Sequence, residues 1–184
     1  MIFKHHNHSI VPRIFLPLDI QEQTIAHIRE CGSNGEEGFV VWSGVSRNGQ
    51  IVVRSAVIPS EGALRRHLGI GFSDRAIEHI ADVIQFKGEK LIAQVHSHPF
   101  GAFHSETDDR FPLIHRKGFL SIVIPFFGKH GFERFDTFRV YEYLQDNQWT
   151  ELDWKNVRRR FRIEGTRKWN KLKSVKSFFL AQEN

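Results

Sequence analysis

Cysteine is nearly absent from this sequence, since Cys31 is the only one among 184 residues. A lone thiol has no partner for a disulfide within the chain, which is typical of proteins of the reducing cytoplasm. It also excludes zinc sites built from several cysteines, including the His-Cys-Cys centre of the nucleobase deaminases. We therefore expect a cytoplasmic protein in which histidine and carboxylate side chains would have to hold any metal.

Long hydrophobic runs are also missing. No stretch approaches the roughly 18 apolar residues that a transmembrane helix needs, so we expect no membrane partner. The first eight residues include His5, His6 and His8 and lack the apolar core of a secretory signal. This histidine-rich tract could bind a metal. We interpret it instead as a mobile terminus or an edge strand.

The net charge of +5 is unevenly distributed along the chain. Residues 155–184 carry ten basic and two acidic side chains, whereas residues 1–154 carry sixteen and nineteen. We therefore divide the chain into a domain at 1–150 and a basic C-terminal extension at 151–184. A solvated helix face explains the extension best, ahead of contact with an acidic protein. Nucleic acid is the least favoured partner.

Hydrophobic periodicity alternates between the helical and the extended pattern, which favours an α/β or α+β fold. Glycine and Asn-Gly pairs punctuate the pattern, and residues 59–71 resemble a loop. We expect helices at 19–31, 73–88, 108–117, 154–162 and 168–179. We expect strands at 39–42, 50–58, 91–98, 119–124 and 135–144, with strand core in the phenylalanine-rich stretch 126–138.

The most informative motif is His96-Ser97-His98-Pro99, followed by Ser105 and Asp108. An apolar run at 91–95 leads into it and predicts a buried strand. Positions two apart on a strand share a face, so His96 and His98 should project together. Two imidazoles and the Asp108 carboxylate make three ligands and leave a fourth position for water. This is the pattern of a catalytic zinc site.

A zinc site of this kind lowers the pKa of its water to about 7. Peptide hydrolysis then needs a general base and a donor for the oxyanion. Ser105 lies one helical turn before Asp108, where its hydroxyl could serve as that donor, as a helix N-cap, or as both. His104 beside it could substitute as a ligand or contact the substrate, but a polar loop residue is the favoured interpretation.

The arrangement His-x-His-Pro followed by Ser-x-x-Asp resembles the signature of the JAMM (MPN+) metallopeptidases. The resemblance implies a curved mixed β-sheet flanked by helices, the MPN/JAB or cytidine-deaminase-like architecture. It also implies a catalytic glutamate just before an upstream strand. Glu37 fits that place, because residues 37–44 align with the family pattern Glu-x-x-Gly-hydrophobic-hydrophobic-x-Gly at its apolar pair and final glycine. Glu36 is the alternative base.

Two departures from the family pattern stand out. Five residues, 100–104, separate the proline from Ser105 where the family usually has six, and Val40 replaces the inner glycine of the glutamate motif. The shorter loop raises Asp109 as an alternative ligand. The Ser-x-x-Asp spacing from Ser105 favours Asp108.

The resemblance also implies a function. Family members are zinc-dependent peptidases or isopeptidases that cleave after the C-terminus of ubiquitin or a ubiquitin-like protein, in precursors or conjugates. They accept the substrate tail as an added strand. The sequence is most similar to bacterial members found beside ubiquitin-activating and ubiquitin-conjugating enzyme homologues, often in antiphage operons. The alternatives are a non-catalytic MPN-type scaffold and a nucleic-acid-associated protein that binds through its basic extension.

Overall fold

A computed structural model describes residues 12–59, 63–66, 69–105, 108, 113–133 and 137–165. Its helices are α1 (Leu18–Ser33), α2 (Asp74–Phe86), α4 (Trp154–Arg160) and the short 3-10 helix η1 (Phe126–Gly128). Its strands are β1 (Arg13–Leu16), β2 (Phe39–Arg47), β3 (Gln50–Val57), β4 (Ala63–Arg66), β5 (Gly69–Phe72), β6 (Lys90–Ser97), β7 (Leu120–Ile124), β8 (Arg139–Tyr143), β9 (Trp149–Glu151) and β10 (Phe161–Ile163).

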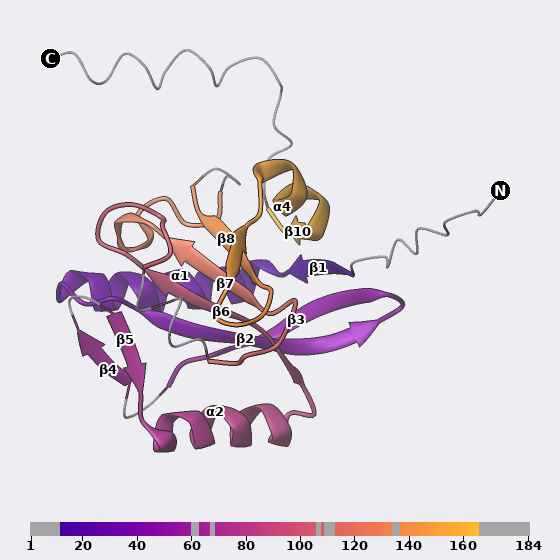
Figure 1. Cartoon of the computed structure of the whole chain (residues 1–184), viewed down its shortest axis with the longest axis horizontal. Helices are drawn as coiled ribbons and strands as arrows, with labels where there is room; N and C mark the ends of the chain where they lie inside the picture. Colours follow the sequence, from indigo (N-terminus) through magenta and orange to yellow (C-terminus); the bar gives the residue numbers. More distant parts are fainter. Residues whose placement is uncertain are drawn as a thin grey trace, which may run out of the picture.

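Eight of these strands form one curled mixed sheet in the order β10-β1-β3-β2-β6-β7-β8-β9 (Figure 1). The pairs β10-β1, β1-β3 and β6-β7 are parallel, and the other pairs are antiparallel. Strands β4 and β5 make a separate antiparallel hairpin. The expected mixed sheet flanked by helices is therefore confirmed.

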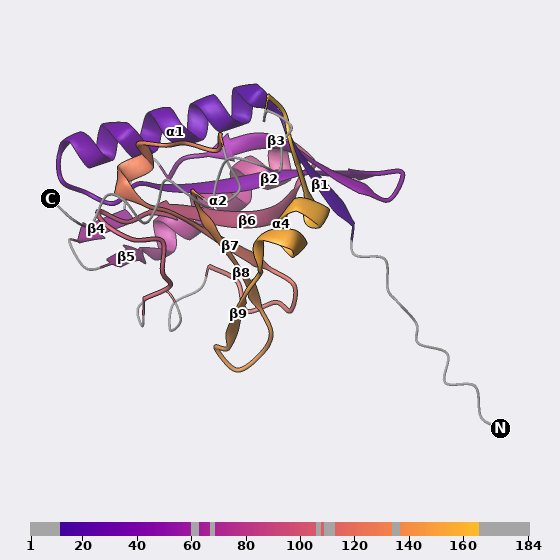
Figure 2. The same cartoon turned by 90° about the horizontal axis from the view of Figure 1, so that it is seen from above.

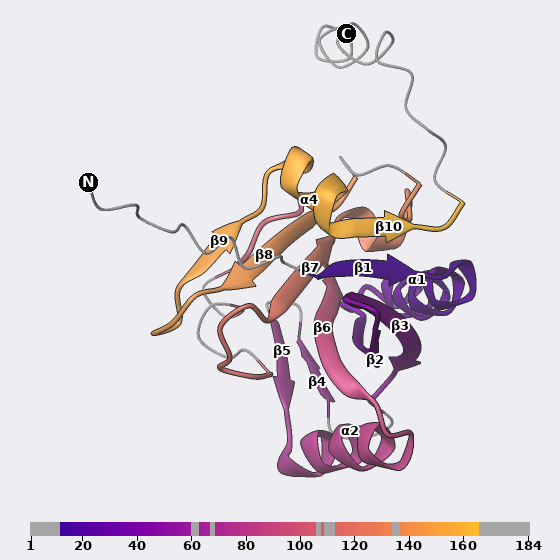
Figure 3. The same ribbon diagram turned by 90° about the vertical axis from the view of Figure 1, so that its right-hand side faces the viewer.

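The two longer helices cover opposite faces of the sheet, as Figure 3 shows. Alternate residues of β2 explain this arrangement, because successive side chains of a strand point to opposite faces. Val40 and Trp42 belong to the large core that includes Ile28 of α1. Phe39 and Val41 belong to a second cluster with Ile80 of α2 and Leu113. Strand β6, which carries the histidine motif, thus lies between two apolar layers.

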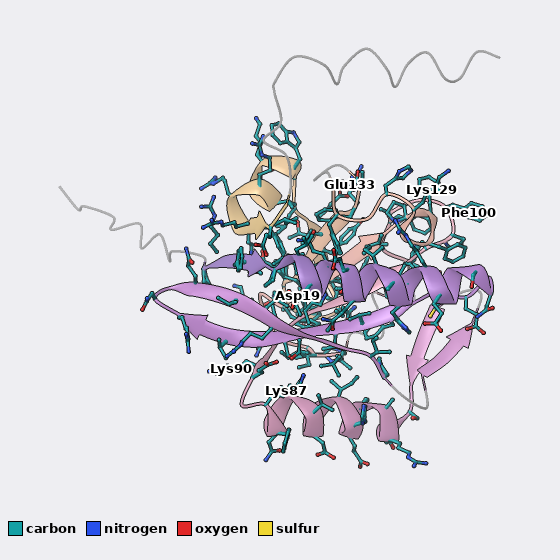
Figure 4. The ribbon with its side chains drawn as sticks, turned by 180° about the vertical axis from the view of Figure 1, so that it is seen from behind. Asp19, Lys87, Lys90, Phe100, Lys129 and Glu133 are labelled. Carbon is teal, nitrogen blue, oxygen red and sulfur yellow. The ribbon has the colours of Figure 1, made fainter. Side chains whose placement is uncertain are left out.

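Helix α2 begins where the sequence predicts, because the Ser73 side chain accepts a hydrogen bond from the Ala76 amide. Its other end is tied to the sheet by Lys87, which donates to Ser55 of β3 at 2.9 Å (Figure 4). Helix α1 starts differently. Its N-cap, Pro17, offers no side-chain acceptor, and the Leu18 amide instead donates to Glu164.

Three expected elements need correction. Residues 59–71, expected as a loop, include β4 and most of the β4–β5 hairpin. The helix expected at 108–117 does not extend through 113–117, which are irregular. Phe126 and Phe127, expected in a strand, lie in η1 with φ of 53° and 48°. Positive φ is incompatible with a strand, so the chain turns sharply after β7.

The C-terminal part of the described chain also differs from the expectation. The helix expected at 154–162 ends at Arg160, and 161–163 form β10 against β1. Phe161 and Ile163 are buried while Arg162 between them is exposed, which is the period of a strand. The helix expected at 168–179 and the histidine tract at 5–8 lie outside the described residues. No helix in the described part of the chain is long and apolar enough to cross a bilayer.

Candidate metal centre

The two motif histidines lie at and just beyond the end of β6, where the sheet passes into a loop. His96 and His98 are 2% and 4% exposed, so their rings lie deep in the molecule. The backbone is tightly held there: the His98 amide donates to Ile124 O, and its carbonyl accepts from Phe127 N. Ser97 is also buried, and its hydroxyl accepts from the Gly38 amide at 2.9 Å.

Asp108 returns from the following loop to face both rings. Its Oδ1 lies 3.3 Å from His96 Nε2, and its Oδ2 lies 3.5 Å from His98 Nε2. Ser105 fixes this carboxylate, because its amide and its hydroxyl both donate to Oδ2 at 2.7 Å. The Asp108 amide donates back to the Ser105 hydroxyl at 3.2 Å. The structure therefore brings His96, His98 and Asp108 together.

These residues fit a metal ion. One ligand atom from each of the three lies within 4.8 Å of the others. Two ligand atoms bound to tetrahedral zinc at about 2.05 Å lie roughly 3.3 Å apart, close to the two distances observed. His96 Nε2 is buried and has no hydrogen-bond partner among the described residues. Its pairing with Asp108 Oδ1 at 3.3 Å is electrostatic and not a hydrogen bond, and a metal ion bound to both atoms would satisfy the nitrogen.

In the triad, the Asp108 carboxylate and the His96 imidazole shift each other's protonation because they lie close together in a buried place. Burial alone would raise the pKa of Asp108, but the His96 and His98 imidazoles and the Ser105 amide hold it far below its ordinary range. Burial also favours neutral His96, yet the carboxylate beside it raises the pKa of this imidazole above its ordinary value. Asp108 is therefore ionised and suited to bind a cation.

Glu37 lies against this centre, just before β2. Strands β2 and β6 are antiparallel with Phe39 opposite His96, so the register continues to Glu37 opposite His98. Residues opposite each other in such a pair share a face. Glu37 is only 6% exposed, and burial raises the pKa of its carboxyl group. Glu36, the alternative base, is half-buried and one residue out of this register.

Two polar residues near the centre, Gln94 and Ser121, were not predicted from the sequence, and Ser121 contacts His104. His104 Nε2 lies 3.0 Å from the Ser121 hydroxyl, which also accepts from Gln94 Nε2 at 3.2 Å. Gln94 and Ser121 are buried polar residues within strands that are otherwise mostly apolar. A polar residue in an apolar run can be seen in the sequence, but the contact with His104 depends on the pairing of β6 with β7.

Exposed aromatic side chains occur in the segments next to His98 in the structure. Phe103 packs edge-on against the His98 ring, with centroids 4.9 Å apart, and is 55% exposed. Phe100 is 75% exposed and projects at the edge of the molecule in the view of Figure 4. Phe126 of η1 is half exposed. Apolar groups therefore flank the buried polar triad.

A mixed α+β fold that holds two imidazoles, a facing carboxylate and a further buried glutamate defines a candidate metal-dependent hydrolase. The chain is 36% identical over 149 residues to the probable metalloprotease y4jG of Sinorhizobium fredii (strain NBRC 101917 / NGR234). The match covers 80% of this chain and 88% of that relative. The chain therefore belongs to the family of y4jG, and the possible metal triad supports a metal-dependent peptidase.

Other comparisons bear on the fold. No family model matches the chain. The solution structure of protein DSY2949 from Desulfitobacterium hafniense has a TM-score of 0.55 at 16% identity, covering 82% of this chain and 92% of that one. The solution structure of a protein from Salinibacter ruber (strain DSM 13855) has a TM-score of 0.51 at 17% identity, covering 75% and 88%. Both likenesses concern the fold alone.

Proposed function

We propose that this protein is a zinc-dependent peptidase or isopeptidase of the JAMM/MPN+ type, with the MPN/JAB architecture. One observation carries the proposal: the ligand atoms of His96, His98 and Asp108 lie close together. One of them, the buried Nε2 of His96, has no hydrogen-bond partner among the described residues. Two imidazole nitrogens and one carboxylate oxygen are a ligand set that catalytic zinc sites of peptidases use. The name of the relative y4jG supports the same class of reaction.

When bound, zinc would act as a Lewis acid that activates water and polarises the scissile carbonyl. Glu37 is the proposed general base. Its burial raises the pKa of its carboxyl group above the ordinary value, which suits a group that accepts a proton and then delivers it to the leaving amine. Ser105 is the proposed oxyanion donor. Its hydroxyl donates to Asp108 Oδ2 in the structure, so this role requires the hydroxyl to rotate.

The proposed substrate is the C-terminal tail of ubiquitin or a ubiquitin-like protein. The small exposure of His96 and His98 supports it, because a narrow approach admits a tail that ends in glycine more readily than a bulky one. The β4–β5 hairpin also supports it. Figures 1 and 2 both place this hairpin at the same end of the molecule as the C-terminal end of β6. A two-stranded hairpin has unpaired edges, to which an extended tail can add as a strand.

The proposal extends to the cellular setting. The partners would be a ubiquitin-like protein or its conjugate, together with ubiquitin-activating and ubiquitin-conjugating enzyme homologues, in the cytoplasm. An antiphage operon in a bacterium is the proposed context. The same centre would serve precursor processing and deconjugation, since both reactions hydrolyse an amide bond after the tail.

The test uses zinc-loaded protein and three probes: ubiquitin fused through its C-terminus to a small reporter domain, lysine-linked diubiquitin, and casein as a general peptidase substrate. We expect wild type to cleave at least one of the two ubiquitin probes and Glu37→Gln to cleave neither at a comparable rate. Cleavage of casein alone would keep the metallopeptidase and overturn the ubiquitin-like substrate. Stoichiometric zinc with no cleavage of any probe would overturn the enzyme and favour a non-catalytic scaffold.

A further inference from the structure

Three polar side chains form a row across the sheet beside the metal centre. Gln94 of β6 pairs with Ser121 of β7, and Ser121 pairs with Tyr141 of β8. Paired residues on neighbouring strands share a face of the sheet. Gln94 lies two positions before His96, so the row points to the same face as that candidate ligand. We call Gln94, Ser121 and Tyr141 the polar row.

Each member of the polar row contacts the segment that carries Asp108. The Tyr141 hydroxyl donates to the carbonyl of Ala102 at 3.4 Å, and the Ser121 hydroxyl lies 3.0 Å from His104 Nε2. Beyond Asp108, the Leu113 amide donates to Gln94 Oε1 at 3.1 Å. The segment is therefore tied to the sheet on both sides of the carboxylate.

His104 is the centre of this attachment. Its ring stacks on Tyr141, with centroids 4.6 Å apart and planes 25° apart, and packs against Trp149 at 4.7 Å. Its centroid lies 6.1 Å from that of His96. The next residue in the chain is Ser105, which binds Asp108 through both its amide and its hydroxyl. Ser105 connects His104 to Asp108, so a displacement of His104 would also displace the carboxylate.

We propose that His104, held by the Ser121 hydroxyl and stacked on Tyr141, is the positioning residue that holds Asp108 at the distance required for metal binding. This inference depends on the metal centre of the proposed function. Asp108 is a helical residue outside the sheet, whereas His96 belongs to a sheet strand and His98 follows it directly. A ligand outside the sheet needs an attachment to it, because metal sites tolerate little displacement of their ligands.

The direct test is the zinc affinity of His104→Leu, measured by competition with a chromophoric zinc chelator. Leucine keeps an apolar group against Tyr141 but cannot bind Ser121. We expect zinc affinity to fall by about 10- to 100-fold, the usual effect of losing a residue that orients a ligand. His104→Gln, whose amide nitrogen can reach the place of Nε2, should recover most of that loss.

His115→Leu is the matched control. His115 is exposed and packs edge-on against Tyr143 at 5.8 Å, so its replacement should leave zinc affinity within about twofold of wild type. Thermal unfolding of the metal-free variants separates a loss of affinity from a loss of folding. Should His104→Leu fail to fold, Ser121→Ala removes the hydroxyl alone and should weaken zinc binding in the same direction.

The possible outcomes are distinct. Wild-type affinity in a folded His104→Leu, or in Ser121→Ala if His104→Leu does not fold, would overturn the positioning role and leave the metal centre intact. Equal losses in His104→Leu and His115→Leu would overturn it too, because the effect would then be unspecific. Wild-type protein that binds no zinc would overturn the proposed function itself. Selective loss in His104→Leu with recovery in His104→Gln would support the inference.

Discussion

Among the individual residues, Asp108 links the charge of the site to the stability of the metal-free protein. The pKa of His96 is raised above its ordinary value of 6.5. Its stabilising contribution is therefore complete below about pH 6.5 and is lost as the pH rises through the raised pKa. The pKa of Asp108 is lowered, so its contribution is present above its ordinary value of 3.8 and persists on acidification. The pair stabilises the metal-free protein most between these two values.

This linkage gives a measurable pH dependence. We compare the free energy of unfolding of wild type and Asp108→Asn by urea denaturation in EDTA. The difference should be larger at about pH 6 than at about pH 9, because neutral His96 no longer pairs with the carboxylate. Zinc should reverse the trend, since its ligands must lose their protons to bind it. With excess zinc, wild-type stability should therefore rise between about pH 5 and 7. A fall over that interval would contradict the ligand assignment.

Glu37 and Glu36 are separated by a pairwise comparison. Glu37→Gln keeps the size of the buried side chain but removes the proton acceptor. We expect it to retain zinc and to lose about 10²- to 10⁴-fold in kcat on the ubiquitin fusion. Glu36→Gln is the control and should retain most activity, because position 36 is one residue out of register with His98. The reverse ranking would assign the base to Glu36.

Among the helices and strands, the length of an element determined whether it could be predicted from the sequence. The apolar run before His96 has a strong local pattern, and it forms the largely buried strand β6. Strands β1, β9 and β10 have only three or four residues and were not predicted, because so few positions cannot show a period. Their existence depends on partners distant in the sequence, such as β1 with β10.

The same distinction applies to the site. His96, His98, Ser105 and Asp108 lie within thirteen residues, so their spacing alone suggested a common centre. The attachment of His104 to Ser121 joins two elements through the parallel pairing of β6 and β7, which no local pattern specifies. Asp109 lies outside the described residues, so the choice of Asp108 over Asp109 stays a prediction from spacing, although Asp108 faces both rings.

The junction between α1 and β2 is sensitive to a single methyl group. A Cβ at position 38 would lie 2.8 Å from the Cα of Ile28, which is backbone and cannot rotate away. Gly38→Ala should therefore destabilise the fold by about 1–3 kcal/mol and displace the neighbouring Glu37. Urea unfolding measures the first effect, and kcat of the zinc-loaded variant measures the second. At position 35 an added methyl group has space, but the φ of +72° disfavours residues other than glycine. Gly35→Ala is therefore the control for backbone strain without a steric clash.

At the scale of the whole molecule, the sheet reaches from one end of the described chain to the other. Strand β10 pairs with β1, and the Gln21 side chain of α1 donates to the carbonyl of Glu164. A deletion that tests the basic extension must therefore spare α4 and β10. Truncation after Gly165 removes five basic residues and one acidic residue and leaves every described element in place.

We expect the truncated protein to keep zinc binding and cleavage of the ubiquitin fusion within about twofold, because the candidate centre lies wholly before residue 109. Any salt-dependent binding of DNA, seen as a gel shift, should weaken, since fewer basic side chains are available to contact the phosphates. Gel shifts at two salt concentrations and the fusion assay measure both. If activity disappeared while zinc remained bound, residues 166–184 would have to take part in substrate binding.

The proposed function depends on the binding of one metal ion by His96, His98 and Asp108. The most direct measurement is elemental analysis of the purified protein after zinc loading and desalting, with Asp108→Ala treated in parallel. We expect about one zinc per wild-type chain and a large loss in the variant, because removal of the only anionic ligand leaves two imidazoles. Wild-type protein without zinc after loading, or an Asp108→Ala variant that retains it in full, would show that these residues do not bind the metal.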